Sequence, residues 1–102
     1  MTTDVIEAAT LAAFRQRYAT RPFHRFSAQP WPVQGRWTQV CAKVVKGDVK
    51  SGQQFRNAYI KGFAGSKEWS QLGREDRDSW GQVFSAAVRA WRAAEAREQE
   101  AA

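Results

Sequence analysis

The sequence predicts an all-α domain with four main helices, arranged as two similar helical hairpins that pack around Trp and Phe residues. Apolar residues recur at helical spacing in four segments, whereas the alternation typical of β-strands is weak. A Phe-Arg-x-x-Tyr pattern occurs twice, and further matches follow each copy. The matching pairs are Phe14/Phe55, Arg15/Arg56, Tyr18/Tyr59, Phe26/Trp69, Ser27/Ser70, Trp37/Trp80, Gln39/Gln82, Val40/Val83 and Val45/Val88. Five Trp, six Phe and two Tyr residues supply large apolar areas for a small helical core.

The first expected helix starts at Asp4, which can act as an N-cap with Glu7 in the first turn. Pro22 cannot continue a helix because its nitrogen carries no hydrogen, so we expect this helix to end near Ala19. Three apolar residues share its core face: Leu11, Phe14 and Tyr18. Residues 20–30 are expected to form an irregular connection.

The second expected helix opens near Pro32, because proline fits the first turn of a helix. Its apolar residues follow helical spacing: Val33, Trp37, Val40, Cys41 and Val44. Gly47 and Asp48 are expected to end it. Cys41 is the one cysteine of the chain and cannot form an intramolecular disulfide, so we interpret it as a buried structural thiol.

A capping-box pattern, Ser51 followed by Gln54, predicts the start of the third helix. Three aromatic residues are expected on this helix: Phe55, Tyr59 and Phe63. Gly62 and Gly65 mark its expected end.

The last helix is expected to follow a turn around Trp69 and Leu72 and to begin near Arg74. Acidic residues near its start suit the positive end of the helix dipole: Glu75, Asp76 and Asp78. Its apolar residues recur along one face: Trp80, Val83, Phe84, Ala87, Val88, Trp91 and Ala94.

The 102 residues are expected to form one helical domain, residues 1–102. The first repeat covers about residues 11–47 and the second about residues 52–92, and we expect residues 95–102 to be a frayed tail. Trp37 and Trp80 occupy matching places and are the expected core anchors. No segment resembles a signal peptide or a membrane span, so we expect a cytoplasmic protein with no membrane partner.

The turn and helix over residues 69–91 resemble parts of known families. The pattern consists of Trp69, Leu72, Glu75, Trp80, Phe84 and Trp91. Its spacing resembles the last helix and preceding turn of an HMG box, a DNA-bending module of three helices. It is also similar to small helical proteins of bacteriophages and their hosts, many without assigned function, which carry a Trp-x-x-Leu turn before an Arg- and Ala-rich helix. Gly73 stands where a Ser or Thr cap is usual in the HMG box, and the residues before Trp69 do not supply its first helix. The second resemblance implies a small accessory protein of phage type.

Positive charge is concentrated in the centre of the chain. Between Ala8 and Lys67 the sequence has eleven Lys and Arg residues and a single acid, Asp48, while the other segments have five basic and nine acidic residues. The formal net charge of +6 therefore combines a centre of +10 with a remainder of −4. Such a distribution predicts one face that binds a polyanion or an acidic protein surface.

Within this centre, the second helix places Arg36, Gln39, Lys43 and Lys46 in a stripe turned about 120° from its apolar stripe. A helix that tracks phosphates requires apolar residues on one side and cations on the other. The corresponding residues of the second copy are Ser79, Gln82, Ala86 and Arg89. The alternative interpretation is that these cations form an ordinary solvated face.

Residues 14–26 interleave aromatic side chains with arginines. Such side chains can stack on bases while guanidinium groups neutralise phosphates, as in proteins that bind single strands. The aromatic residues with counterparts in the second copy are expected in the core: Phe14, Tyr18 and Phe26. Phe23 and His24 are then free for contact. One His and one Cys with no nearby carboxylates predict no metal site.

Catalysis is not indicated, because the chain has no Gly-rich phosphate loop and no nucleophile with an evident base. We expect a protein that is not an enzyme and has no cofactor. Two hypotheses remain. In the first, it is a nucleic-acid-binding accessory protein for DNA or RNA. The phosphate-binding residues would be Arg15, Arg17, Arg21, Arg25, Arg36, Lys43, Lys46 and Lys50.

In the second hypothesis, the chain is a protein-binding effector or inhibitor of the phage counter-defence type. It would dock its basic face on an acidic surface of a host protein complex that handles nucleic acid. A phage-encoded protein would act in the host cytoplasm. Both a monomer and a homodimer are compatible with the sequence, and Trp31 and Trp91 are candidates for a dimer interface.

Overall fold

The computed structural model describes residues 3–101, with side chains for residues 4–100. The elements are α1 (Thr3–Arg17), the 3₁₀ helix η1 (Phe26–Ala28), α2 (Trp31–Lys46), α3 (Gly52–Tyr59), the 3₁₀ helix η2 (Trp69–Gln71) and α4 (Arg74–Ala101). The described residues contain no β-strand, so the predicted all-α class with four main helices is confirmed. None of the helices in this part of the chain is sufficiently long and apolar to span a bilayer.

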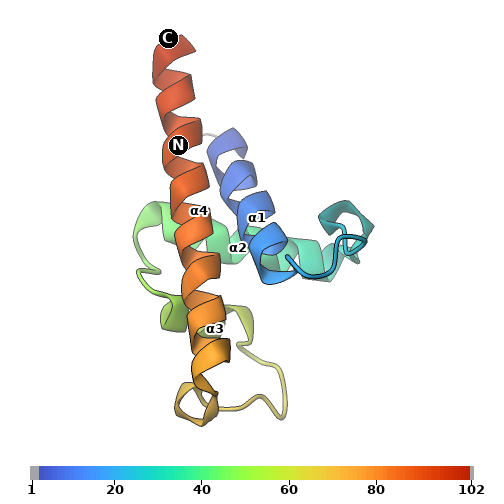
Figure 1. Ribbon diagram of the computed structural model, residues 1–102. Coiled ribbons are helices and arrows are strands. Elements are labelled where there is room, and N and C mark those ends of the chain that lie inside the picture. Colours follow the sequence, from blue (N-terminus) through green and yellow to red (C-terminus); the bar gives the residue numbers. More distant parts are fainter. Residues whose placement is uncertain (1–2, 102) are drawn as a thin grey trace.

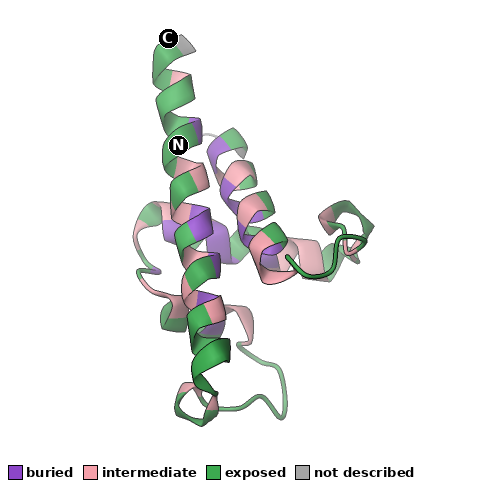
Figure 2. Ribbon diagram, in the orientation of Figure 1, coloured by how far each residue is buried: buried purple, intermediate pink, exposed green. Residues whose placement is uncertain are grey.

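Helix α4 is the longest element and contacts the other three helices. Figure 1 shows α1 alongside α4, α2 crossing behind both, and α3 packed against the N-terminal half of α4. The C-terminal part of α4 continues past the packed region, and Figure 2 shows that this end is largely exposed. The long dimension of the molecule, 46 Å, follows this helix.

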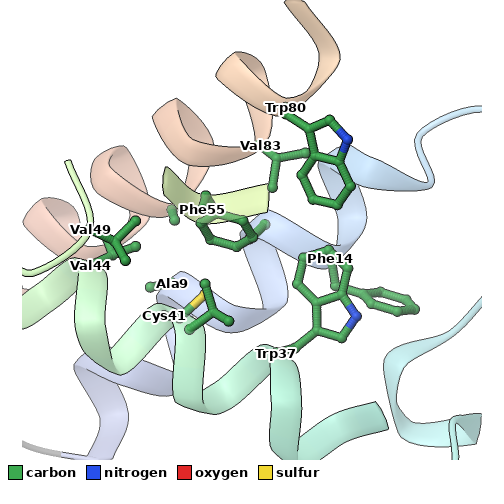
Figure 3. Packing of buried hydrophobic residues seen from close by; sticks show 12 residues of the cluster. Ala9, Phe14, Trp37, Cys41, Val44, Val49, Phe55, Trp80 and Val83 are labelled. Atoms are coloured by element: carbon green, nitrogen blue, oxygen red, sulfur yellow. The ribbon is translucent and has the colours of Figure 1, made fainter. Parts of the chain in front are cut away.

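The core is a cluster of aromatic rings around Trp37 of α2. The indole rings of Trp37 and Trp80 are stacked with their centroids 6.5 Å apart, and their side chains are 0% and 6% exposed. Phe14 packs edge-on against Trp37 at 5.5 Å, and Phe55 lies 5.8 Å from the same ring. Figure 3 shows these side chains converging from all four helices. Trp37 and Trp80 are therefore core residues, as predicted.

Small residues line the buried face of α1. Ala9 and Ala13 are fully buried on α1, and Figure 2 shows the buried stripe of α1 turned toward its neighbours. Leu11 is 39% exposed, so its predicted place on the core face is wrong. Residues two apart on a helix do not share a face, and Ala9 and Ala13, two positions before and after Leu11, are the buried residues.

The helix ends follow local signals closely. Gly47 ends α2 in the left-handed conformation with φ of 88°, as predicted. Ser51 caps α3, because its Oγ accepts a hydrogen bond from the Gln54 backbone N–H at 3.1 Å. The side chain of Gln54 in turn accepts from the Lys50 N–H at 2.7 Å.

Two other helix boundaries differ from the predictions. Asp4 lies inside the first turn of α1, which begins at Thr3. Helix α3 ends at Tyr59, so Phe63 lies outside it in the following loop. Helix α4 continues through Ala101, and residue 102 lies outside the described part. The fraying expected for residues 95–102 stays a prediction.

The start of α3 touches the backbone of α4. A Cβ atom on Gly52 would lie 2.6 Å from the Cα atom of Gly81, which is closer than a real Cβ can approach. The two helices can therefore meet here only because residue 52 has no side chain.

The order helix, 3₁₀ helix, helix occurs twice along the chain, first as α1, η1, α2 and then as α3, η2, α4. This order is compatible with the predicted pair of helical hairpins. The structural equivalence of the two copies stays a prediction.

Candidate functional site

The eight basic residues predicted to contact phosphates lie in several places on the molecule. Arg21 and Arg25 lie in the connection before α2, whereas Lys46 and Lys50 lie at and just beyond its C-terminal end. A helix of 16 residues is about 24 Å long, so these pairs are well separated. The eight residues do not form one compact cluster.

A groove between α2 and α3 brings three cations together. It has a volume of about 320 Å³ and is lined by Arg36, Lys43 and Lys61, with Gln39 beside them. Arg36 and Lys43 belong to the predicted stripe, while Lys61 was not predicted as a site residue. Lys61 follows the end of α3, and a pattern read along α2 alone could not place it there.

Arg36 has a structural role in this groove. Its Nη1 donates to the carbonyl oxygens of Tyr59 and Lys61, both at 2.8 Å. The guanidinium also lies 4.3 Å from the ring centroid of Phe63. Arg36 therefore connects α2 to the C-terminal end of α3, where helix carbonyls lack partners within the helix.

The connection between α1 and α2 presents two large aromatic side chains to solvent. Phe23 is 91% exposed and Trp31, the first residue of α2, is 83% exposed. Arg21 and Arg25 in the same connection are also exposed. Phe23 is thus free for contact as predicted, and Trp31 is an additional aromatic residue that sequence reasoning did not assign to the site.

His24 is not free for contact, and this prediction is wrong. Its ring is stacked on Phe14 with a centroid distance of 5.4 Å and an interplanar angle of 10°. It also lies 4.1 Å from the Tyr18 ring centroid. The turn at residues 21–24, in which the His24 N–H donates to the Arg21 carbonyl, folds the imidazole back onto the core.

Two further predicted residues lie on α1. Arg15 is exposed in a shallow groove between α1 and α4, together with Arg89. Arg17 is half-buried, and its guanidinium carbon lies 4.7 Å from a Trp80 ring centroid and 5.9 Å from that of Tyr18. Arg17 therefore interacts with aromatic faces of the core.

The central cations are not neutralised by the acidic residues of the described chain. The salt bridge seen there joins Arg74 and Asp78 on α4, at 3.9 Å. None of the eleven Lys and Arg residues between Ala8 and Lys67 forms a salt bridge with a described residue. The exposed cations among them, such as Lys43, Lys46 and Lys50, therefore have no carboxylate partner among the described residues.

The Cys41 thiol is enclosed by the core. Its side chain is 0% exposed, as predicted for a buried cysteine, and burial raises its pKa to about 12. The thiol is therefore protonated at neutral pH and shielded from reagents. Within the described residues, no group of three or more His, Cys, Asp and Glu side chains is placed to hold a metal ion.

Comparisons with protein-family models, with curated proteins and with solved structures find no match to this chain.

Proposed function

We propose that this protein is a small, non-catalytic nucleic-acid-binding accessory protein that contacts a single strand without reading its sequence. The observation that carries the proposal is the pair of exposed aromatic side chains, Phe23 and Trp31, in a connection that also exposes Arg21 and Arg25. Aromatic rings stack on any base, and arginines beside them neutralise phosphates.

The groove between α2 and α3 extends this surface. Lys43 and Lys61 line the groove, and neither forms a salt bridge with a described residue. Lys46 and Lys50 follow at the end of α2 and are exposed. A strand stacked on the aromatic residues at the start of α2 could continue along these cations, since α2 connects the two regions.

Binding is tested by fluorescence anisotropy with labelled single-stranded DNA, single-stranded RNA and duplex DNA at several salt concentrations. Engagement of about six phosphates gives a slope of log affinity against log salt of roughly −4 for single strands and −5 for duplexes. The proposal expects tighter binding to single strands than to the duplex. Equal weak binding to all three, with no salt dependence, would contradict it.

Two sets of variants separate stacking from charge. Phe23→Ala with Trp31→Ala is expected to weaken single-strand binding tenfold or more, since stacking contributes about 1–3 kcal/mol per base. The matched control is Leu11→Ala, another exposed apolar residue, which should leave binding unchanged.

Lys43→Glu with Lys46→Glu should lower both the affinity and the salt slope. Its matched control is Arg92→Glu with Arg97→Glu, an equal charge change on the exposed end of α4. Arg36 is left intact in these variants because it holds α2 to α3.

The second candidate function is a protein-binding effector or inhibitor. Exposed Trp31 favours it as well, because tryptophan and arginine are frequent anchors of protein interfaces. A pull-down from nuclease-treated host lysate tests this role. Specific capture that is lost in the Phe23→Ala, Trp31→Ala variant, together with no affinity for any nucleic acid, would select it. Either role suits the phage-type proteins that the sequence resembles, acting in the host cytoplasm.

A further inference from the structure

A small pocket lies on the other side of α3, where the end of α1 and the start of α4 meet it. Its volume is about 290 Å³, and its lining includes Arg17, Tyr18, Arg56, Tyr59, Asp76 and Trp80. This pocket is distinct from the groove between α2 and α3, which has a different lining. The proposed stacking and phosphate contacts do not use it.

Arg56 is the unusual residue of this pocket. Its side chain is only 5% exposed, and Nη1 is buried with no hydrogen-bond partner. The guanidinium forms no salt bridge or side-chain hydrogen bond within the described part of the chain. Burying a charge without a partner is costly, and buried guanidinium groups are normally paired with an anion. The arrangement therefore lacks a counter-ion.

A second guanidinium lines the same pocket. Arg17 lies against the Trp80 ring at 4.7 Å and has no carboxylate partner in the described residues. Two guanidinium groups favour a dianion over a monoanion, and their planar N–H donors match the oxygens of a phosphate group. The phenols of Tyr18 and Tyr59 add O–H donors to the lining.

We propose that this pocket binds a phosphate monoester, with Arg56 and Arg17 contacting the phosphate and the Trp80 and Tyr59 rings contacting its organic group. The inference goes beyond the proposed nucleic-acid binding and does not depend on it. The volume of about 290 Å³ is at the lower end of small-molecule sites, so the ester is small. A free phosphate ester and the 5′-phosphate end of a strand both carry this chemistry.

Asp76 is the acidic residue of the lining. It is exposed in the first turn of α4 and forms no salt bridge with Arg17 or Arg56. Its negative charge opposes a phosphate, so removing the charge should strengthen binding. If Asp76 were instead the solution partner of Arg56, removing it would destabilise the protein and leave phosphate without effect. The same variant therefore distinguishes a ligand site from an internal ion pair.

The test uses the full chain and phenyl phosphate as the probe, followed by calorimetry and by ¹H–¹⁵N spectra of the arginine side chains. Saturable binding that shifts the Arg56 Nε–H signal supports the proposal. Benzoate, a monoanion with the same ring, should bind about tenfold more weakly. No saturable binding of phenyl phosphate, or equal affinity for benzoate, would overturn it.

Variants then locate the site. Arg56→Met should weaken phenyl phosphate binding about tenfold or more, because it removes charged hydrogen bonds. Arg97→Met removes an exposed arginine at the C-terminal end of α4 and should have no effect. Asp76→Asn should strengthen binding about two- to fivefold, whereas Asp78→Asn should not. Unchanged affinity in Arg56→Met would place the binding elsewhere and contradict the assignment. If Arg56→Met fails to fold, Arg56→Lys and the Asp76 variant provide the same comparison.

The source of the ester is resolved with two oligonucleotides that differ only in a 5′-phosphate or a 5′-hydroxyl. Displacement of phenyl phosphate by the phosphorylated strand alone assigns the pocket to strand ends. Binding of phenyl phosphate that neither strand displaces assigns it to a free small ester. Displacement by both strands alike would show that the pocket does not read a phosphate monoester, and would overturn the proposal.

Discussion

The two Phe-Arg-x-x-Tyr segments differ in how far their arginine is buried, although they carry the same motif. Phe14 in α1 and Phe55 in α3 are both buried, at 3% and 0% exposure. The arginines that follow them differ, because Arg15 is exposed while Arg56 is only 5% exposed. The local motif therefore sets which residue enters the core, and the neighbouring elements decide whether the arginine beside it is covered.

The residue three positions before each phenylalanine shows the cause. In α1 this residue is Leu11, which is 39% exposed. In α3 it is Gly52, which lies against the backbone of Gly81 in α4. The close approach of α3 to α4 brings Arg56 under the start of α4, where Asp76 and Trp80 line the same pocket.

The largest effect is expected from a change that separates α3 from α4, because their close approach covers Arg56 while Arg15 stays exposed. Gly52→Ala should lower the free energy of unfolding by about 2–3 kcal/mol, because its Cβ would overlap the backbone of Gly81. Gly81→Ala is the matched control, since a Cβ at that position meets nothing within 4 Å. It should raise the free energy of unfolding by about 0.5–1 kcal/mol through helix propensity.

Urea denaturation followed by circular dichroism measures both glycine variants. If Gly52→Ala lowers and Gly81→Ala raises the free energy of unfolding, the contact excludes a side chain at position 52 but not at position 81. A loss of less than about 0.5 kcal/mol for Gly52→Ala would show that the helices are farther apart in solution.

The next test replaces each arginine of the pair by methionine in phosphate-free buffer. Arg56→Met should raise the free energy of unfolding by about 1–2 kcal/mol, because it removes a buried charge that has no partner. Arg15→Met should change it by less than about 0.5 kcal/mol, as expected at an exposed position. A clear loss of stability in Arg56→Met would mean that the guanidinium has a protein partner in solution.

Short-range signals were sufficient to predict much of the fold. Helix ends at Gly47 and Ser51 depend on the conformation of one residue or on one hydrogen bond to a near neighbour, and both were predicted. The all-α class and the tryptophan core followed from apolar spacing. The end of α3 was misplaced because Arg36, distant in sequence, binds the carbonyls of Tyr59 and Lys61 there.

The surroundings of Arg17, His24 and Arg56 could not be predicted, because they depend on contacts between elements that are distant in the sequence. Positive charge along the chain predicted a basic protein, but not that Arg17 lies on Trp80 or that Arg56 is enclosed. His24 was expected to be exposed because the turn that folds it onto Phe14 has no sequence signature. The buried state of Arg56 could not be predicted from a motif that leaves Arg15 exposed.

The loss of stability at alkaline pH tests whether Tyr59, the last residue of the second Phe-Arg-x-x-Tyr segment, is as buried in solution as in the structure. Burial raises the pKa of Tyr59 above its ordinary value of 10.0, and the nearby Tyr18 adds to this effect. The folded state then holds the phenol proton more tightly than the unfolded chain. The resulting contribution to stability is complete below about pH 10 and is lost as the pH rises through the folded pKa.

Tyr59→Phe removes this titration, so its stability should decline less steeply above about pH 10 than that of the wild type. Denaturant titrations at a series of pH values from neutral to strongly alkaline measure the two slopes. Cys41, whose pKa is raised to about 12, is present in both proteins and does not affect the difference. Identical slopes would indicate that Tyr59 is solvated in the folded state.

The smallest expected effect concerns the residue of α1 that matches Gly52. Leu11→Gln should change the free energy of unfolding by less than about 0.5 kcal/mol, because the side chain is 39% exposed. Ala9→Gln, at a fully buried position two residues earlier, is the contrasting variant and should be strongly destabilising. Thermal denaturation at two protein concentrations measures both. A cost above about 2 kcal/mol for Leu11→Gln, appearing only at the higher concentration, would mean that a second copy covers the outer face of α1. Both Phe-Arg-x-x-Tyr segments would then be covered, and the contrast between Arg15 and Arg56 would hold for the monomer alone.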